Sequence, residues 1–242
     1  MMKSDLIIEN GERPISATLF YGARTERAVI ALHGFTSNRK SETVMNIAQV
    51  ATADNAAVLS FDMPEHGDRR AQKGTLTVKN VLEDYTKVVE YVKEEVSDRI
   101  SLFGSSLGGY FSLLAARYEP SVEQILLKSP ALNPIKTLTK AMKECDNEAR
   151  CDLLRRLVRD ITGGGNGYSV YELAKKYPYP KTDIIWGKKD EVVDSYDVKS
   201  FVAVAPERIA LTAISCGHQF LTANAQRSLS EWFAATFCQR NQ

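Results

Sequence analysis

The pentapeptide 104–108 reads Gly-Ser-Ser-Leu-Gly, a pattern that can present a serine hydroxyl for nucleophilic attack. It follows the apolar run 100–103 and opens the small-residue-rich run 107–118, which predict a strand and a helix. A serine on such a sharp turn needs small residues two positions before and after it, because strand and helix crowd together there. We therefore predict Ser106 as the nucleophile. Ser105 is the alternative hydroxyl, but it lacks the symmetric glycines.

A serine nucleophile needs a base, and the chain contains three histidines. His218 lies between the strand-like run 209–214 and the last predicted helix, where a loop leaves the carboxyl end of a sheet. His33 and His66 lie in earlier loops, and we expect them to be structural or to shape the substrate site. Position and chain order therefore predict His218 as the general base.

The base in turn needs an acid that fixes its tautomer and stabilises the imidazolium. Asp190 lies just beyond the strand-like run 183–186, where a carboxylate can reach a histidine one strand away. Glu191 and Asp194 are close alternatives. Asp62 also follows a predicted strand, but it precedes the serine and suits a loop-stabilising role.

An oxyanion that forms on attack needs two backbone N–H donors. One should come from Leu107, the residue after the nucleophile, at a helix N-terminus that also favours negative charge. The other should come from the loop after Leu32, where Gly34 lets the backbone turn inward and Phe35 offers its amide. We therefore predict Phe35 and Leu107 as the oxyanion hole.

The elements that must position these residues alternate along most of the chain. Apolar patterns predict strands at 6–8, 15–21, 28–32, 56–61, 99–103, 124–127, 183–186 and 209–214, and helices at 43–53, 78–96, 107–118 and 229–237. Alternating strands and helices predict an α/β fold, a mostly parallel sheet with helices on both faces. The first two strands, joined by a turn at Asn10-Gly11, should form an antiparallel edge.

The segment 134–180 interrupts this alternation. Residues 135–160 look helical, the glycine-rich stretch 163–167 is a flexible break, and Pro178 and Pro180 mark the return to the sheet. At fewer than about 50 residues the segment is too short for its own core. We predict one domain over 1–242 with a cap insertion at about 134–180. Its tyrosines could pack the cap, line an aromatic pocket or meet a partner.

The amino-acid composition limits the kinds of partner that we expect the protein to bind. The 31 Lys and Arg balance 30 Asp and Glu, so no strong field exists to attract nucleic acid or an anionic membrane. No signal peptide and no apolar stretch of about 20 residues is evident, which favours the cytoplasm. The four cysteines form no CxxC pair and are expected as free thiols. We expect no metal and no cofactor, and the sequence leaves the oligomeric state open.

The chain order Ser106, Asp190, His218 resembles that of the α/β-hydrolase superfamily. Within it the chain looks like small carboxylesterases, including feruloyl and cinnamoyl esterases, and like prolyl-oligopeptidase-like hydrolases. The segment 61–68 is similar to the family's D-x-x-G-H-G-x-S loop, but Glu65 replaces a glycine and Asp68 is followed by arginine instead of serine. That loop is usually structural.

The resemblance implies acyl transfer from a small-molecule ester, thioester or amide through an acyl-enzyme, with no cofactor. A serine at position 106 disfavours a haloalkane dehalogenase, which needs a carboxylate, and a dienelactone hydrolase, which needs a cysteine. A carboxylic ester hydrolase is our first hypothesis. A serine peptidase, amidase or thioesterase on the same fold is the second. A non-catalytic binding protein that has kept the fold is a third, of a different class.

Overall fold

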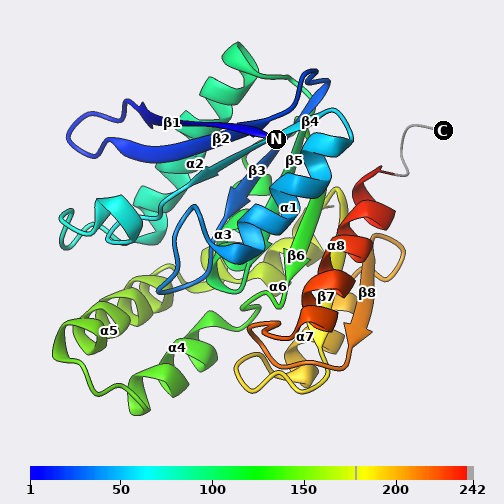
Figure 1. Cartoon of the computed structure of the whole chain (residues 1–242). Helices are drawn as coiled ribbons and strands as arrows, with labels where there is room; N and C mark the ends of the chain where they lie inside the picture. The colour runs from blue at the N-terminus through cyan, green and yellow to red at the C-terminus, as the bar shows by residue number, and fades with distance from the viewer. Residues whose placement is uncertain (178, 239–242) are drawn as a thin grey trace.

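The computed structural model describes residues 1–177 and 179–238, and its centre is an eight-stranded sheet between two layers of helices (Figure 1). The strand order is β1-β2-β4-β3-β5-β6-β7-β8. The strands are β1 (Met2–Ile8), β2 (Ile15–Tyr21), β3 (Arg27–Leu32), β4 (Ala56–Phe61), β5 (Ile100–Ser105), β6 (Val122–Lys128), β7 (Lys181–Gly187) and β8 (Ile209–Ile214). All eight predicted strands are therefore present, several of them longer than the apolar runs that predicted them.

The helices cover both faces of this sheet. They are α1 (Glu42–Ala53), η1 (Gly67–Arg69), α2 (Val78–Glu95), α3 (Leu107–Ala116), α4 (Pro134–Lys143), α5 (Glu148–Gly163), η2 (Gly165–Tyr168), α6 (Val170–Lys176), α7 (Ser195–Val202) and α8 (Ala223–Phe237). One apolar cluster joins α1 and α8 to the sheet, and the other joins it to α2, α3, α7 and the inserted helices. Figure 1 shows α1 and α8 side by side in front of the strands.

Strand direction agrees with the predicted topology. β1 pairs antiparallel with β2, and β2 pairs antiparallel with β4. From β4 to β8 every neighbouring pair is parallel. Parallel strands end at the same edge, so the loops after β3, β5, β7 and β8 leave the sheet on one side. The four predicted site segments lie in or directly after those strand ends.

Helix α2 shows why a predicted element forms where it does. Its first residues are capped by Thr77, whose hydroxyl accepts the N–H of Asn80 at 3.1 Å. Val81, Tyr85 and Val88 recur at helical spacing and are buried against the sheet. The helix thus begins at a capping residue and continues because one stripe of it is apolar.

The inserted segment between β6 and β7 differs in detail from the prediction. The stretch 135–160 is two helices, α4 and α5, with a break at 144–147, and α5 runs on to Gly163. Asn133, Asn147 and Ser169 cap the starts of α4, α5 and α6. Figure 1 shows α4 and α5 as a hairpin that projects from the body of the molecule. We predicted neither α6 nor α7.

The break between α4 and α5 carries a disulfide between Cys145 and Cys151. The expectation of four free thiols was therefore wrong for these two residues, because it considered only spacing and compartment. The end of α4 and the start of α5 bring the two sulfurs together. Cys216 and Cys238 are free thiols.

Two of the inserted tyrosines pack the insertion onto the core. Tyr179 is buried, and the hydroxyl of Tyr171 donates to the carbonyl of Asp197 at 2.7 Å. The ring of Tyr171 meets Phe201 edge-on. Tyr177 is exposed, and Pro178 lies outside the described residues. Among the helices that the structure describes, none is long and apolar enough to cross a membrane.

Candidate active site

Ser106 lies on a strained turn between β5 and α3, with φ +52° and ψ −117°. A non-glycine residue adopts positive φ only where its surroundings hold it there. A Cβ on Gly104 would come 2.5 Å from the Cα of Gly109, and one on Gly108 would overlap the Leu32 carbonyl. The small residues on either side of Ser106 are therefore required by close approach of strand and helix, as the pattern predicts.

His218 and Asp190 complete a chain of hydrogen bonds that begins at Ser106. The Nε2 atom of His218 lies 3.0 Å from the Ser106 Oγ. The Nδ1 atom of His218 lies 3.0 Å and 2.9 Å from the two carboxylate oxygens of Asp190. The structure thus brings together three predicted residues that are up to 112 positions apart in the sequence. Such an arrangement can move a proton from serine to imidazole while a carboxylate fixes the ring.

Asp190 is held as an ionised carboxylate by its neighbours. Its side chain is fully buried, and Oδ1 accepts the backbone N–H groups of Val192 at 2.9 Å and Val193 at 2.8 Å. Burial alone raises the pKa of Asp190, but hydrogen bonds from His218 and Val193 outweigh it, so the pKa lies below its ordinary value. A buried negative charge beside Nδ1 favours the tautomer that leaves Nε2 free to accept a proton.

The two alternative acids lie elsewhere. Glu191 is exposed, and its Oε2 accepts the backbone N–H of His218 at 3.2 Å, away from the imidazole nitrogens. Asp194 caps the start of α7 by accepting the Tyr196 N–H at 2.8 Å. Both acids therefore support the loops around the site. The sequence alone could not separate them from Asp190, because all three follow the same strand.

The other histidines have structural contacts. His33 Nε2 accepts the backbone N–H of Met63 at 3.1 Å, and its Nδ1 lies 2.7 Å from the Gly34 carbonyl. Burial and the neighbouring His66 lower the pKa of His33 to about 3, so the ring is neutral. His66 is buried with Nδ1 2.9 Å from the Pro64 carbonyl. We predicted that both histidines are structural or shape the substrate site, and both have backbone contacts that hold their loops.

Asp62 stabilises the loops next to the site. Its carboxylate accepts the backbone N–H of Arg39 at 2.8 Å and that of Asp68 at 3.0 Å, and it also bonds the Arg39 guanidinium. Glu65, which takes the place of a glycine in the family's loop, makes a contact that we did not predict. It forms a two-point ion pair with Arg156 of α5, at 3.1 Å and 3.0 Å, which ties this loop to the insertion.

Leu107 directly follows Ser106, and Phe35 lines the same small cavity as the serine. Leu107 is the first residue of α3, so its N–H has no acceptor within the helix. Phe35 lies in the turn that Gly34 and Ser37 close with a 3.2 Å backbone hydrogen bond. Gly34 adjoins the nucleophile, because a Cβ there would lie 3.3 Å from the Cβ of Ser106. Two backbone amides are thus available near the serine.

A small cavity of about 60 Å³ opens at Ser106. His33, Phe35 and His218 line it, together with Lys128 and hydroxyl-bearing residues of the loop that leads into α1. A cavity of this size has room for water or for a small polar group. No cluster of histidine, cysteine and acidic residues among the described positions could hold a metal ion.

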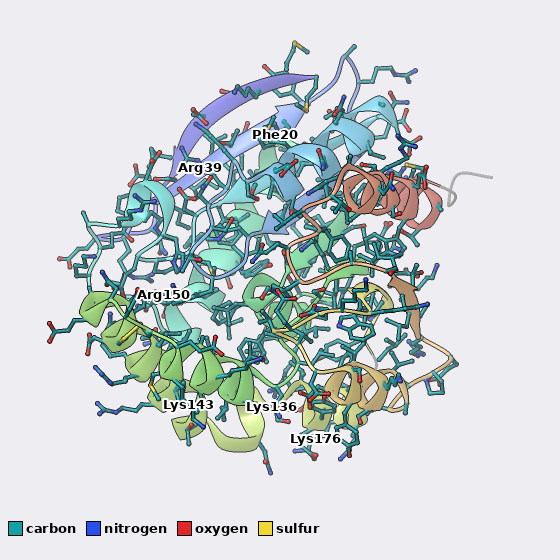
Figure 2. All side chains as sticks on the ribbon, turned by 60° about the horizontal axis from the view of Figure 1, so that its bottom comes forward. Phe20, Arg39, Lys136, Lys143, Arg150 and Lys176 are labelled. Carbon is teal, nitrogen blue, oxygen red and sulfur yellow. A yellow bond between two sulfur atoms is a disulfide. The ribbon has the colours of Figure 1, made fainter. Side chains whose placement is uncertain are left out.

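The insertion is also tied to the loop that carries Asp190. Lys136 of α4 forms ion pairs with Asp194 at 2.9 Å and with Asp197 at 3.2 Å, and Lys140 bonds the Glu191 carbonyl. Figure 2 shows Lys136 between α4 and α7. The same view shows Lys143 and Arg150 on the outer part of the α4–α5 hairpin. The α4 arm of the hairpin is thus fastened to the loop of Asp190, and the α5 arm to the loop of Glu65.

The parallel sheet and the strand–turn–helix at Ser106 are those of an α/β-hydrolase. The family described as serine aminopeptidase, S33, matches residues 23–161, which is more than half of the chain. The chain therefore belongs to this family, and it is a hydrolase of the α/β fold. No curated protein sequence matches it.

Solved structures that resemble the chain include two esterases and a thioesterase domain. An esterase from Pyrococcus furiosus is 20% identical, with a TM-score of 0.78 over 97% of this chain and 91% of that one. Est1E from Butyrivibrio proteoclasticus, solved with ferulic acid bound, is 19% identical, with a TM-score of 0.76 over 95% and 98% of the two chains. A thioesterase domain from the curacin biosynthetic pathway is 15% identical, with a TM-score of 0.67 over 96% and 99%. These similarities confirm the predicted fold and the resemblance to esterases.

Proposed function

We propose that this protein hydrolyses carboxylic esters through an acyl-enzyme formed on Ser106. The observation that carries the proposal is the hydrogen-bonded chain from Ser106 through His218 to Asp190. Neither backbone strain at the serine nor a buried carboxylate behind the histidine is needed for packing alone. Both are expected where a hydroxyl must be activated.

The geometry supports a two-step reaction. His218 Nε2 takes the proton of Ser106 as Oγ attacks the ester carbonyl, and the amides of Phe35 and Leu107 hold the oxyanion. His218 then gives its proton to the leaving alcohol as the acyl-enzyme forms. Water attacks the acyl carbon and loses a proton to the same nitrogen, and His218 then gives that proton to Ser106 Oγ as the bond to the acyl group breaks and the acid leaves. Asp190 remains ionised throughout.

Hydrolysis of short-chain p-nitrophenyl esters tests this proposal. We expect Ser106→Ala to lose essentially all activity above the uncatalysed rate, while Ser105→Ala, the neighbouring hydroxyl, keeps most of it. A fluorophosphonate probe should label the wild type and the Ser105 variant but not the Ser106 variant. Equal rates in wild type and Ser106→Ala would contradict the assignment. Failure of the folded protein to react with the probe would favour the non-catalytic binding protein.

Two other acyl substrates fit the same residues. The family description favours amide bonds of peptides, and a thioesterase domain is among the similar folds. Esters, thioesters and amides differ in leaving group and not in the activation of serine, so they share one proposed mechanism. A panel of p-nitrophenyl esters, methyl ferulate, acyl thioesters and aminoacyl p-nitroanilides ranks them by kcat/KM. A strong preference for the anilides would reverse the order we propose.

A further inference from the structure

A buried lysine lies directly behind the proposed site. Lys128 is the last residue of β6, and only 2% of it is exposed. The rest of that strand end is apolar, with Ile125, Leu126 and Leu127 fully buried before it. An ammonium in such a place loses its hydration, which is costly unless other groups compensate. An apolar side chain would fill the same position without that cost.

Lys128 touches both the nucleophile's turn and the histidine's loop. Its backbone carbonyl accepts the N–H of Ser106 at 2.9 Å. Its Nζ donates to the backbone carbonyl of His218 at 2.8 Å and lies 4.4 Å from the centre of the Phe220 ring. Phe220 itself has φ +54°, so the loop that it shares with His218 is held in an unusual conformation. One side chain thus fastens that loop to the end of β6.

Among the described residues, the groups named against the ammonium come from two loops. Asp190 approaches from the loop after β7, and Cys216 and His218 approach from the loop after β8. Burial lowers the pKa of Lys128 to about 8, although the negative charge of Asp190 opposes the shift. Burial raises the pKa of the Cys216 thiol, so that thiol titrates at a higher pH than the lysine. Lys128 therefore loses its charge at a lower pH than the Cys216 thiol gains one.

We propose that Lys128 is a positioning residue, whose ammonium holds the His218 backbone and the Phe220 ring so that the imidazole meets Ser106. This inference rests on the proposed function, because it requires His218 to act as the base. A charged donor binds a carbonyl about twice as strongly as a neutral one, and only the charged form is attracted to an aromatic face. Loss of the proton from Nζ should loosen the histidine loop and slow the reaction.

Two substitutions separate the charge of Lys128 from its bulk. Lys128→Met keeps nearly the same length without a donor, whereas Lys128→Arg keeps a charge that no accessible pH removes. Lys128 borders the cavity of about 60 Å³, so the larger guanidinium is not enclosed by protein atoms on every side. Lys93→Met is the matched control, since Lys93 is on the outer surface of α2 in an ion pair with Glu119. Circular dichroism and thermal unfolding establish that each variant is folded.

We expect Lys128→Met to lower kcat by about 10- to 100-fold at pH 7, the scale of a small misplacement of a catalytic group, with KM little changed. Wild-type kcat should decline as pH rises through about 8. That decline should be absent from both variants, because neither methionine nor arginine loses a charge near pH 8. If Lys128 were needed only for packing, its substitution would lower the free energy of unfolding and leave the pH dependence of kcat unchanged.

Wild-type kcat in Lys128→Met, or a decline near pH 8 that persists in Lys128→Arg, would overturn the inference. If Lys128→Met does not fold, the pH dependence of kcat in Lys128→Arg alone tests the inference. Fluorophosphonate labelling keeps the two proposals distinct. A wild type that neither hydrolyses esters nor reacts with the probe refutes the proposed function, whereas an active, labelled wild type with an unaffected Lys128→Met refutes only the role of Lys128.

Discussion

Asp190→Asn should inactivate the protein without unfolding it. Oδ1 of Asp190 accepts two backbone N–H groups, from Val192 and Val193, at 2.9 Å and 2.8 Å. An asparagine has one acceptor oxygen, and these two donors should hold it in place. The two backbone N–H groups occupy the acceptor sites of that oxygen, so the NH₂ group takes the place of Oδ2, which lies 2.9 Å from His218 Nδ1. Because two N–H groups cannot face each other, the imidazole proton moves to Nε2, and the nitrogen next to Ser106 can no longer accept a proton.

The expected loss in kcat follows from the interaction that the substitution removes. Loss of the correct tautomer in a serine triad costs roughly 10³- to 10⁴-fold in kcat, which corresponds to about 4 to 5.5 kcal/mol of barrier. KM should change little, because the Asp190 side chain is fully buried and out of reach of substrate. The loop keeps its backbone hydrogen bonds, so the free energy of unfolding should fall by only about 1 to 2 kcal/mol.

Steady-state kinetics on a p-nitrophenyl ester, together with urea unfolding, measure both quantities. Asp194→Asn is the matched control, since it makes the same substitution four residues later at the start of α7. It should keep activity near the wild-type value. An Asp190→Asn variant that is folded and within tenfold of wild type would refute the reasoning, because another acid would then have to orient His218.

Two further predictions concern the frame around the site. Gly108→Ala should lower the free energy of unfolding by about 2 kcal/mol or more and abolish ester hydrolysis, because the new Cβ overlaps the Leu32 carbonyl, whereas Gly163→Ala, which has open space, should be harmless in both assays. Thiol titration of the denatured, unreduced protein should find two free cysteines, and four after reduction, because Cys145 and Cys151 are joined. Four thiols before reduction would contradict the pairing.

Much of the fold could be predicted because its signals are local. The apolar run of β3 and the helical spacing of Val81, Tyr85 and Val88 each depend on residues close together in the chain. The glycines around Ser106 are a steric requirement of one turn, and the five consecutive residues 104–108 are enough to recognise it. Helices α6 and α7 escaped prediction because they are short, and their start depends on the caps Ser169 and Asp194.

The sequence by itself determined the kinds of residue and their order, from Ser106 to Asp190 to His218, at the ends of strands that share one edge. Only the tertiary structure decided which of three acids faces the imidazole, because the choice depends on where one loop turns. The same holds for the lysine at the end of β6, which the sequence shows only as a charge that ends an apolar run. Contacts between distant segments depend on strand order and loop path, and no local pattern records them.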